Sequence, residues 1–244
     1  MQDRTDAPAA GAPPVRPATR SWLKALAASS GAAGVAWLML ATSSGDGRWL
    51  QAGAFALVYG VLITALTLLV FQPHPELVAE RRAAAKLAPR WDRRLVVLQG
   101  LMLPLMMVVA GLDRRHWWLT PVPAAAAVPA GAGMMLLGGA LTVWSMRVNA
   151  FFSSHVRVQL DRGHHVVDQG PYRWLRHPGY GGSALINLGG ALLLGSWPAL
   201  TVASGFVALT ALRITLEERV LREQLPGYRD YCASVRHRLL PWLW

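Results

Sequence analysis

The chain has 244 residues, of which 53% are hydrophobic and only 15% are charged. A soluble domain carries about a quarter charged residues, so this balance argues against a soluble protein and favours one embedded in lipid. A formal net charge of +11 could indicate a nucleic-acid-binding protein. The basic residues, however, lie on alternate loops, which indicates membrane topology and contact with anionic lipid.

We predict an all-α, multi-span transmembrane helical bundle behind a disordered tail at residues 1–20, which lacks any apolar run. Six apolar runs suggest five or six spans, because the fifth is short for an upright helix. Ser196, Trp197 and Pro198 lie at the junction of the last two runs, which predicts a tight C-terminal helical hairpin. The runs cover residues 22–42, 49–71, 95–112, 122–148, 183–197 and 199–216.

Residues 21–148 are expected to hold the N-terminal spans, with an amphipathic cytoplasmic loop at 74–93. Pro73 and Pro75 end the second span before that loop. Glycines at 131–140 indicate close helix packing in the fourth span. Except for Arg48, Arg114 and Arg115, the Lys and Arg residues lie on alternate segments, so both termini are predicted to be cytoplasmic, in a bacterial inner membrane.

The region 149–244 is predicted to be catalytic, because its segment 149–180 is the longest polar stretch among the spans. Gly170-Pro171 and His177-Pro178-Gly179 predict a loop there rather than a helix. Non-helical backbone at membrane depth survives only where it lines a cavity or is buried in protein. The hairpin returns the Glu217-Glu218 pair, expected to start a further helix, to the same face as this loop.

Residues 164–182, the Glu217-Glu218 pair, Leu221, the motif 226–228, Tyr231 and Val235 together resemble the isoprenylcysteine carboxyl methyltransferase and phospholipid methyltransferase superfamily. The resemblance covers about the last hundred residues. Residues 75–77 with Glu80 and Arg81 also look like an element that many bacterial members carry. The resemblance implies an S-adenosylmethionine-dependent membrane methyltransferase whose cytoplasmic cofactor pocket is closed by the loop and the C-terminal helix. Consistent with this, no GxGxxG motif predicts a Rossmann domain.

The predicted catalytic residues are His177, Arg173 and Glu218. Arginine side chains suit the carboxylate of the cofactor, although Arg173 and Arg176 would suit anionic lipid headgroups equally well. The faces of aromatic rings suit its sulfonium. Glu218 is preferred to Glu217 because Glu217 can pair with Arg213 along a helix. The residues expected to bind the cofactor are His164, Val166, Gly170, Pro171, Tyr172, Arg176, His177, Pro178, Tyr180, Gly182, Glu217 and Glu218.

The expected partners are membrane lipids and a lipophilic or small methyl acceptor, with neither nucleic acid nor metal. A carboxylate acceptor needs no general base, whereas an amine or thiol would require one, for which His177 is the first choice. The alternatives are a haem-binding redox protein and a small transporter. Both are disfavoured because the spans lack the histidines or ionisable residues that such sites need. The sequence gives no indication of oligomeric state.

Overall fold

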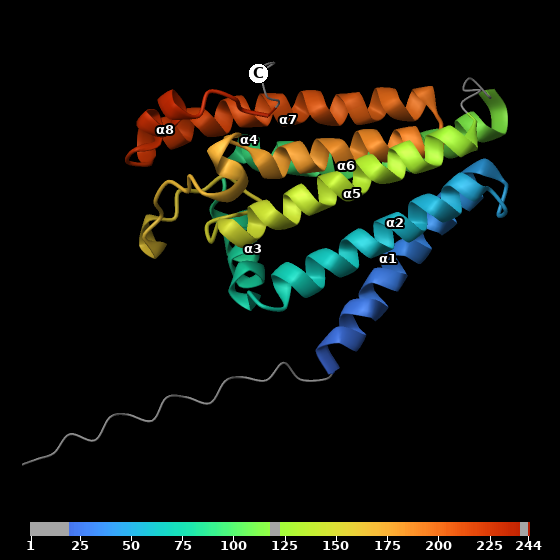
Figure 1. The fold of residues 1–244 in the computed structure, drawn as a ribbon, viewed down its shortest axis with the longest axis horizontal. Coiled ribbons are helices and arrows are strands. Elements are labelled where there is room, and N and C mark those ends of the chain that lie inside the picture. Colours follow the sequence, from blue (N-terminus) through green and yellow to red (C-terminus); the bar gives the residue numbers. More distant parts are fainter. Residues whose placement is uncertain (1–19, 118–122, 240–243) are drawn as a thin grey trace, which may run out of the picture.

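The computed structural model describes residues 20–117, 123–239 and 244, and every regular element within these ranges is a helix (Figure 1). The all-helical prediction is therefore confirmed, whereas the predicted tail falls almost wholly outside the described residues. The long helices are α1 (Arg20–Ser44), α2 (Leu50–Leu66), α3 (Pro75–Leu87), α4 (Arg90–Leu112), α5 (Ala124–Val148), α6 (Pro178–Leu194) and α7 (Trp197–Gln224). A short helix, α8 (Tyr228–Ser234), follows them.

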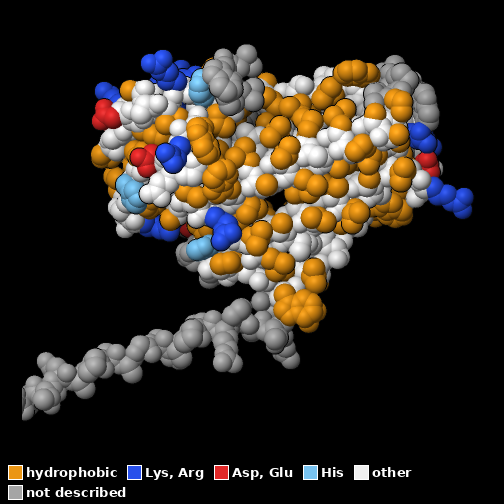
Figure 2. All heavy atoms as spheres, in the orientation of Figure 1, with side chains coloured by type: hydrophobic (Ala, Val, Ile, Leu, Met, Phe, Trp, Pro, Cys, Tyr) orange, Lys and Arg blue, Asp and Glu red, His pale blue; other side chains and the backbone are white. Residues whose placement is uncertain are grey.

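Five of these helices, α1, α2, α4, α5 and α7, are long and apolar enough to cross a membrane. Single π turns, Thr67–Phe71 and Asp113–Trp117, extend α2 and α4. Helix α6 has 17 residues and is about 25 Å long at the usual rise per residue, short of a typical span. Figure 2 shows apolar side chains over the middle of the visible face and charged ones toward its two ends. The chain is an integral membrane protein.

Several helix boundaries differ from the apolar runs, because backbone hydrogen bonding continues a helix past the residues that favour lipid. Helix α6 begins at Pro178 instead of residue 183, since proline suits the first helical position. The expectation that Glu217 and Glu218 start a new helix is wrong, because α7 runs unbroken to Gln224 and they lie near its end. The break comes at Gly227, whose φ is 78°.

Helices α5 and α6 pack with their backbones nearly in contact. A Cβ atom on Gly182 would collide with the carbonyl oxygen of Gly138, and one on Gly189 with that of Gly131. Small residues allow this approach, as predicted for the glycines of the fourth span. The predicted hairpin is also present: Gly195 turns the chain in the left-handed region with φ 66°, and the hydroxyl of Ser196 caps α7.

The loops of the bundle fall at two ends. At one end, Arg114 pairs with Asp46 at 3.3 Å, and the hydroxyl of Ser196 donates to Asp113 at 2.7 Å. These contacts join the loops that were predicted to face away from the cytoplasm. The opposite end carries α3, the segment 149–177 and α8 (Figure 1). The polar region therefore lies at one end of the bundle, although the sidedness of that end in the membrane stays a prediction.

Candidate active site

A cavity of about 390 Å³ lies at the end of the bundle that carries α3 and α8. Its volume is in the range of small-molecule sites, roughly 300–1,000 Å³. The segments 151–157 and 164–167 form one wall, and the start of α6, the end of α7 and α8 form another. Val96, Gln99 and Gly100 from α4 and Phe206 from α7 extend the cavity between these two helices.

His177 occupies the turn that starts α6. The following proline excludes it from the α-helical region, and its backbone has φ −128° and ψ 57°. Its carbonyl oxygen accepts from the amides of Tyr180 and Gly181, and its own amide donates to the carbonyl of Arg238 at 3.0 Å. The imidazole is buried and lines the cavity, and its Nε2 atom lies 3.4 Å from Glu218 without the geometry of a hydrogen bond.

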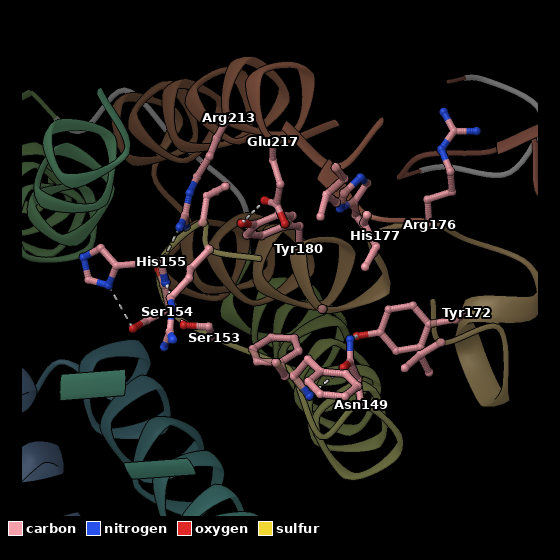
Figure 3. A pocket seen from close by; sticks show the side chains of 18 of the residues that line it. Asn149, Ser153, Ser154, His155, Tyr172, Arg176, His177, Tyr180, Arg213 and Glu217 are labelled. Carbon is pink, nitrogen blue, oxygen red and sulfur yellow. Dashed lines mark hydrogen bonds between the residues drawn. The ribbon is translucent and has the colours of Figure 1, made fainter. Parts of the chain in front are cut away.

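Glu217 is the carboxylate at the end of α7 that lines the cavity. It accepts a hydrogen bond from the hydroxyl of Tyr180 at 2.7 Å, and the two side chains point toward one another in Figure 3. The guanidinium of Arg213 stacks over the Tyr180 ring, with its Cζ atom 5.3 Å from the centroid. An acidic group, a phenol and a cation therefore meet at the middle of the cavity.

Arg213 is held by partners far away in the sequence. Its Nε atom donates to Asp92 at 2.9 Å, and its terminal nitrogen donates to the carbonyl of Ser154 at 2.7 Å. Asp92 is fully buried and also accepts from the amide of Val156 at 3.0 Å. This pairing replaces the weak Arg213–Glu217 pair considered from the sequence. It leaves Glu217 available to the cavity, and it fixes the segment 153–156 against α4 and α7.

Glu218, one residue along, is buried outside the lining of the cavity, and three arginines surround its carboxylate. Its Oε1 accepts from Arg176 at 2.6 Å, and its Oε2 accepts from Arg222 at 2.8 Å and Arg238 at 3.1 Å. Arg176 also donates to the carbonyl oxygens of Val235 and residue 236. We call Glu218, Arg176, Arg222 and Arg238 the Glu218 cluster. It ties the 176–177 turn, the end of α7 and the segment after α8 together.

His164 is presented to the cavity in its neutral form. Its Nδ1 atom accepts from the amide of Gln159 at 3.1 Å, so the proton of the neutral ring resides on Nε2. Burial, reinforced by the charges of His165 and Arg162, lowers its pKa to about 4. The ring stacks on Phe151 with 4.4 Å between centroids. His164 is thus an uncharged donor at neutral pH.

Three tyrosines complete the wall opposite α4. The hydroxyl of Tyr231 donates to the carbonyl of Tyr172 at 2.8 Å, and the hydroxyl of Tyr172 accepts from Asn149 at 3.2 Å. Burial raises the pKa values of Tyr172, Tyr228 and Tyr231, so all three are neutral phenols. Among the described residues, neither the buried Tyr228 hydroxyl nor the buried His177 Nε2 atom has a hydrogen-bond partner, although Nε2 lies 3.4 Å from Glu218. Unpaired buried polar atoms are costly, so their presence beside a cavity indicates a polar ligand.

The structure brings about half of the predicted site residues to the cavity. Those that line it are His164, Val166, Tyr172, Arg176, His177, Tyr180 and Glu217. The remaining ones, Gly170, Pro171, Arg173, Pro178, Gly182 and Glu218, lie outside the lining. Arg173 is exposed to solvent, and Gly182 packs against α5. Gly170 needs its left-handed φ of 56° to start the turn that positions Tyr172.

Several lining residues were not predicted as site residues. Tyr228 and Tyr231 stood in the motif that carried the resemblance, so that motif could have identified them. The segment 151–157 and the α4 residues Gln99 and Gly100 belong to no motif. Their place in the cavity follows from tertiary packing. Among the described residues, no group of three His, Cys, Asp or Glu side chains could hold a metal ion.

Comparison with known proteins gives a match to the segment that contributes most of the residues lining this cavity. Residues 126–226 match the phospholipid methyltransferase family, which belongs to the membrane methyltransferase superfamily that the motifs resemble. The matched segment runs from α5 to the end of α7 and so includes His177, Tyr180 and Glu217. The predicted resemblance is confirmed over these residues. No curated protein matches the chain.

Proposed function

We propose that the protein is an S-adenosylmethionine-dependent methyltransferase that modifies a lipophilic acceptor at the membrane surface. The observation that carries this proposal is the cavity itself. Most of its wall comes from the matched segment, and the buried Tyr228 hydroxyl, which has no hydrogen-bond partner among the described residues, indicates a polar ligand there. Because the matched family consists of methyltransferases, we assign the methyl donor S-adenosylmethionine as this ligand.

The residues present fit the groups of S-adenosylmethionine. Glu217 offers a carboxylate to an ammonium or a ribose diol. The aromatic faces of Tyr172 and Tyr231 suit a sulfonium, because the face of an aromatic ring attracts cations. Neutral His164 and the unpaired Tyr228 hydroxyl supply donors for the carboxylate or the adenine. Arg176 is already bound within the Glu218 cluster, which makes it a structural support for the pocket.

When bound, S-adenosylmethionine would supply a methyl group whose bond to the sulfonium sulfur breaks as the acceptor's lone pair forms the new bond, leaving a neutral thioether. The protein's task is to align and desolvate the reactants. Tyr180 and Arg213 hold Glu217 and the centre of the cavity in place through the contacts described above. If the acceptor is an amine or a thiol, the imidazole of His177, which lines the cavity, can take its proton.

Cofactor binding tests this proposal. Calorimetry with the purified protein should detect one S-adenosylhomocysteine per chain, and the ligand should raise the melting temperature by mass action. Tyr228→Phe removes only the unpaired hydroxyl and should weaken binding by roughly 2- to 10-fold, as expected for one hydrogen bond. Tyr59→Phe, in the apolar core of the spans, is the matched control and should bind normally.

The absence of both heat and a melting shift at millimolar ligand in the unmodified protein would overturn the cofactor assignment. The acceptor is found by incubating the protein with methyl-labelled cofactor and a lipid extract, followed by mass spectrometry of the labelled product.

The proposal also includes the orientation of the protein in the membrane. The cavity faces the cytoplasm of a bacterial inner membrane, because the segments around it carry most of the basic residues.

A further inference from the structure

A row of basic and then apolar side chains runs along the side of α4 that faces away from the cavity. On the cavity side, Asp92 and Leu95 are buried, and Val96 and Gln99 line the cavity. The members of the row recur at every third or fourth position, which places them together on the opposite helical face. The row, which we call the outer face of α4, consists of the exposed residues Arg90, Arg93, Arg94, Val97, Leu98, Leu101 and Leu105.

The three arginines of the outer face have no carboxylate partner. Among the side chains that the structure describes, none of the three forms an ion pair. Asp92, their neighbour in the sequence, is turned to the opposite face, where it accepts from Arg213. Three positive charges within the first five residues of a helix repel one another, so an anionic group beside them would stabilise this end of α4.

The start of the outer face also has the shape and the polarity that an anionic group needs. An open depression lies there, and it is lined by Arg90, Arg93, Arg94, Val97 and Leu98. Helix α4 begins at this point without a side-chain cap, so the amides of its first turn add a partial positive charge to that of the arginines. The depression therefore combines positive charge with an apolar border.

The length of the outer face matches one leaflet of a bilayer. From Arg90 to Leu105 it rises about 22 Å at the usual 1.5 Å per residue, which is about half of the 40–45 Å that a bilayer spans with its headgroups. Helix α4 is one of the helices long and apolar enough to cross a membrane. A soluble anion would need only the arginines. A phospholipid uses the whole row, because its charged headgroup lies beside the arginines and its acyl chains lie beside the leucines.

We propose that the outer face of α4 binds an anionic phospholipid as a stabilising partner. Its headgroup contacts the three arginines, and its acyl chains lie along Val97, Leu98 and Leu101. This site is separate from the cavity, so the bound lipid is not the methyl acceptor and the inference does not depend on the proposed function. The lipid holds the turn of α4 from which Asp92 reaches inward to Arg213 and to the amide of Val156.

Thermal melting of the purified full chain in an uncharged detergent tests this site. The chain is titrated with phosphatidylglycerol or with phosphatidylcholine of the same acyl chains, and a lipid that binds the folded chain raises the melting temperature by mass action. Phosphatidylglycerol should give its half-maximal shift at a concentration at least about 10-fold lower. Each arginine near a lipid surface contributes roughly 5-fold in affinity. Replacing Arg90, Arg93 and Arg94 together with glutamine should therefore abolish the preference, whereas replacing all three with lysine should retain most of it.

The matched control removes the same charge from three other elements, by replacing the exposed Arg147, Arg219 and Arg236 with glutamine. This variant should keep the preference, and an equal loss in both glutamine variants would show a general effect of net charge and refute the site. No preference in the unmodified protein would refute it as well. Inorganic phosphate should cause no shift, and a shift as large as that of phosphatidylglycerol would rule out a lipid. If the triple glutamine variant does not fold, Arg94→Gln should still weaken the preference by roughly 5-fold relative to Arg147→Gln.

Discussion

Glu217 and Glu218 are neighbours on α7, and the structure gives them separate tasks that a pair of isosteric substitutions can distinguish. Glu218→Gln keeps the volume of the side chain but removes the charge that faces the buried guanidinium of Arg176. Glu217→Gln removes the carboxylate that lines the cavity, while its remaining oxygen can still accept from Tyr180. The first change should therefore act on stability and the second on cofactor binding.

The loss of stability expected for Glu218→Gln follows from the burial of its ion pair with Arg176. The side chains of Glu218 and Arg176 are only 1% and 6% exposed, and breaking a buried ion pair from one side costs about 3–5 kcal/mol. Arg222 and Arg238 are 39% and 24% exposed, so their contacts add little. Because the glutamine retains one acceptor oxygen, we take the lower value, about 3 kcal/mol. For a chain of this size each kcal/mol lowers the melting temperature by about 2–4 °C, which gives a decrease of about 6–12 °C.

Thermal melting in detergent and calorimetric titration with S-adenosylhomocysteine check both variants. Glu217→Gln should melt within about 2 °C of the unmodified protein, because the hydrogen bond from Tyr180 is retained. Its cofactor affinity should fall by roughly 10-fold or more if the carboxylate meets the ammonium or ribose. The reasoning is refuted if Glu218→Gln melts like the unmodified protein, or if Glu217→Gln binds the cofactor normally.

Three other predictions concern pH, packing and topology. The pKa of His164 is lowered to about 4 in the folded chain from about 6.5. Its stabilising contribution is therefore complete above pH 6.5 and lost as the pH falls through 4, which melting curves should show; His164→Asn should lack this component. Gly182→Leu should destabilise the α5–α6 contact and lower the melting temperature, whereas Gly133→Ala, where a Cβ has open space, should not. A cysteine introduced at Arg48 should be labelled from outside intact cells, and one at Arg90 should not; the reverse pattern would overturn the topology.

The membrane architecture could be predicted because it depends on local properties of the sequence. Hydropathy marks the spans, and glycine and proline mark their ends, so the hairpin at Gly195 and Ser196 needed no tertiary information. The turn at His177 could likewise be predicted, since a proline restricts the backbone conformation of the residue before it. The extent of α7 was misjudged, because the end of an apolar run marks where lipid ends and not where backbone hydrogen bonding ends.

The arrangement within the site could not be predicted from local pattern. Two adjacent residues of a helix point in directions about 100° apart, so the choice between Glu217 and Glu218 depends on the rotation of α7 about its axis. Contacts such as that between Arg213 and Asp92, 121 residues apart, help to set this rotation. Single-sequence spacing carries no signal for such a pair.

Helix α6, which follows His177 and carries Tyr180 on its first turn, is sheltered from lipid by its neighbours. It packs against α5 and α7 along its length and also contacts α2 and α4. Helix α2, by contrast, presents exposed Leu57 and Val61 outward. Differences in bilayer thickness act on lipid-facing helices through tilting and local deformation. The outer helices can therefore adjust to membranes of different composition with little change in the geometry around Tyr180, so the proposed activity should tolerate changes in the lipids of the host.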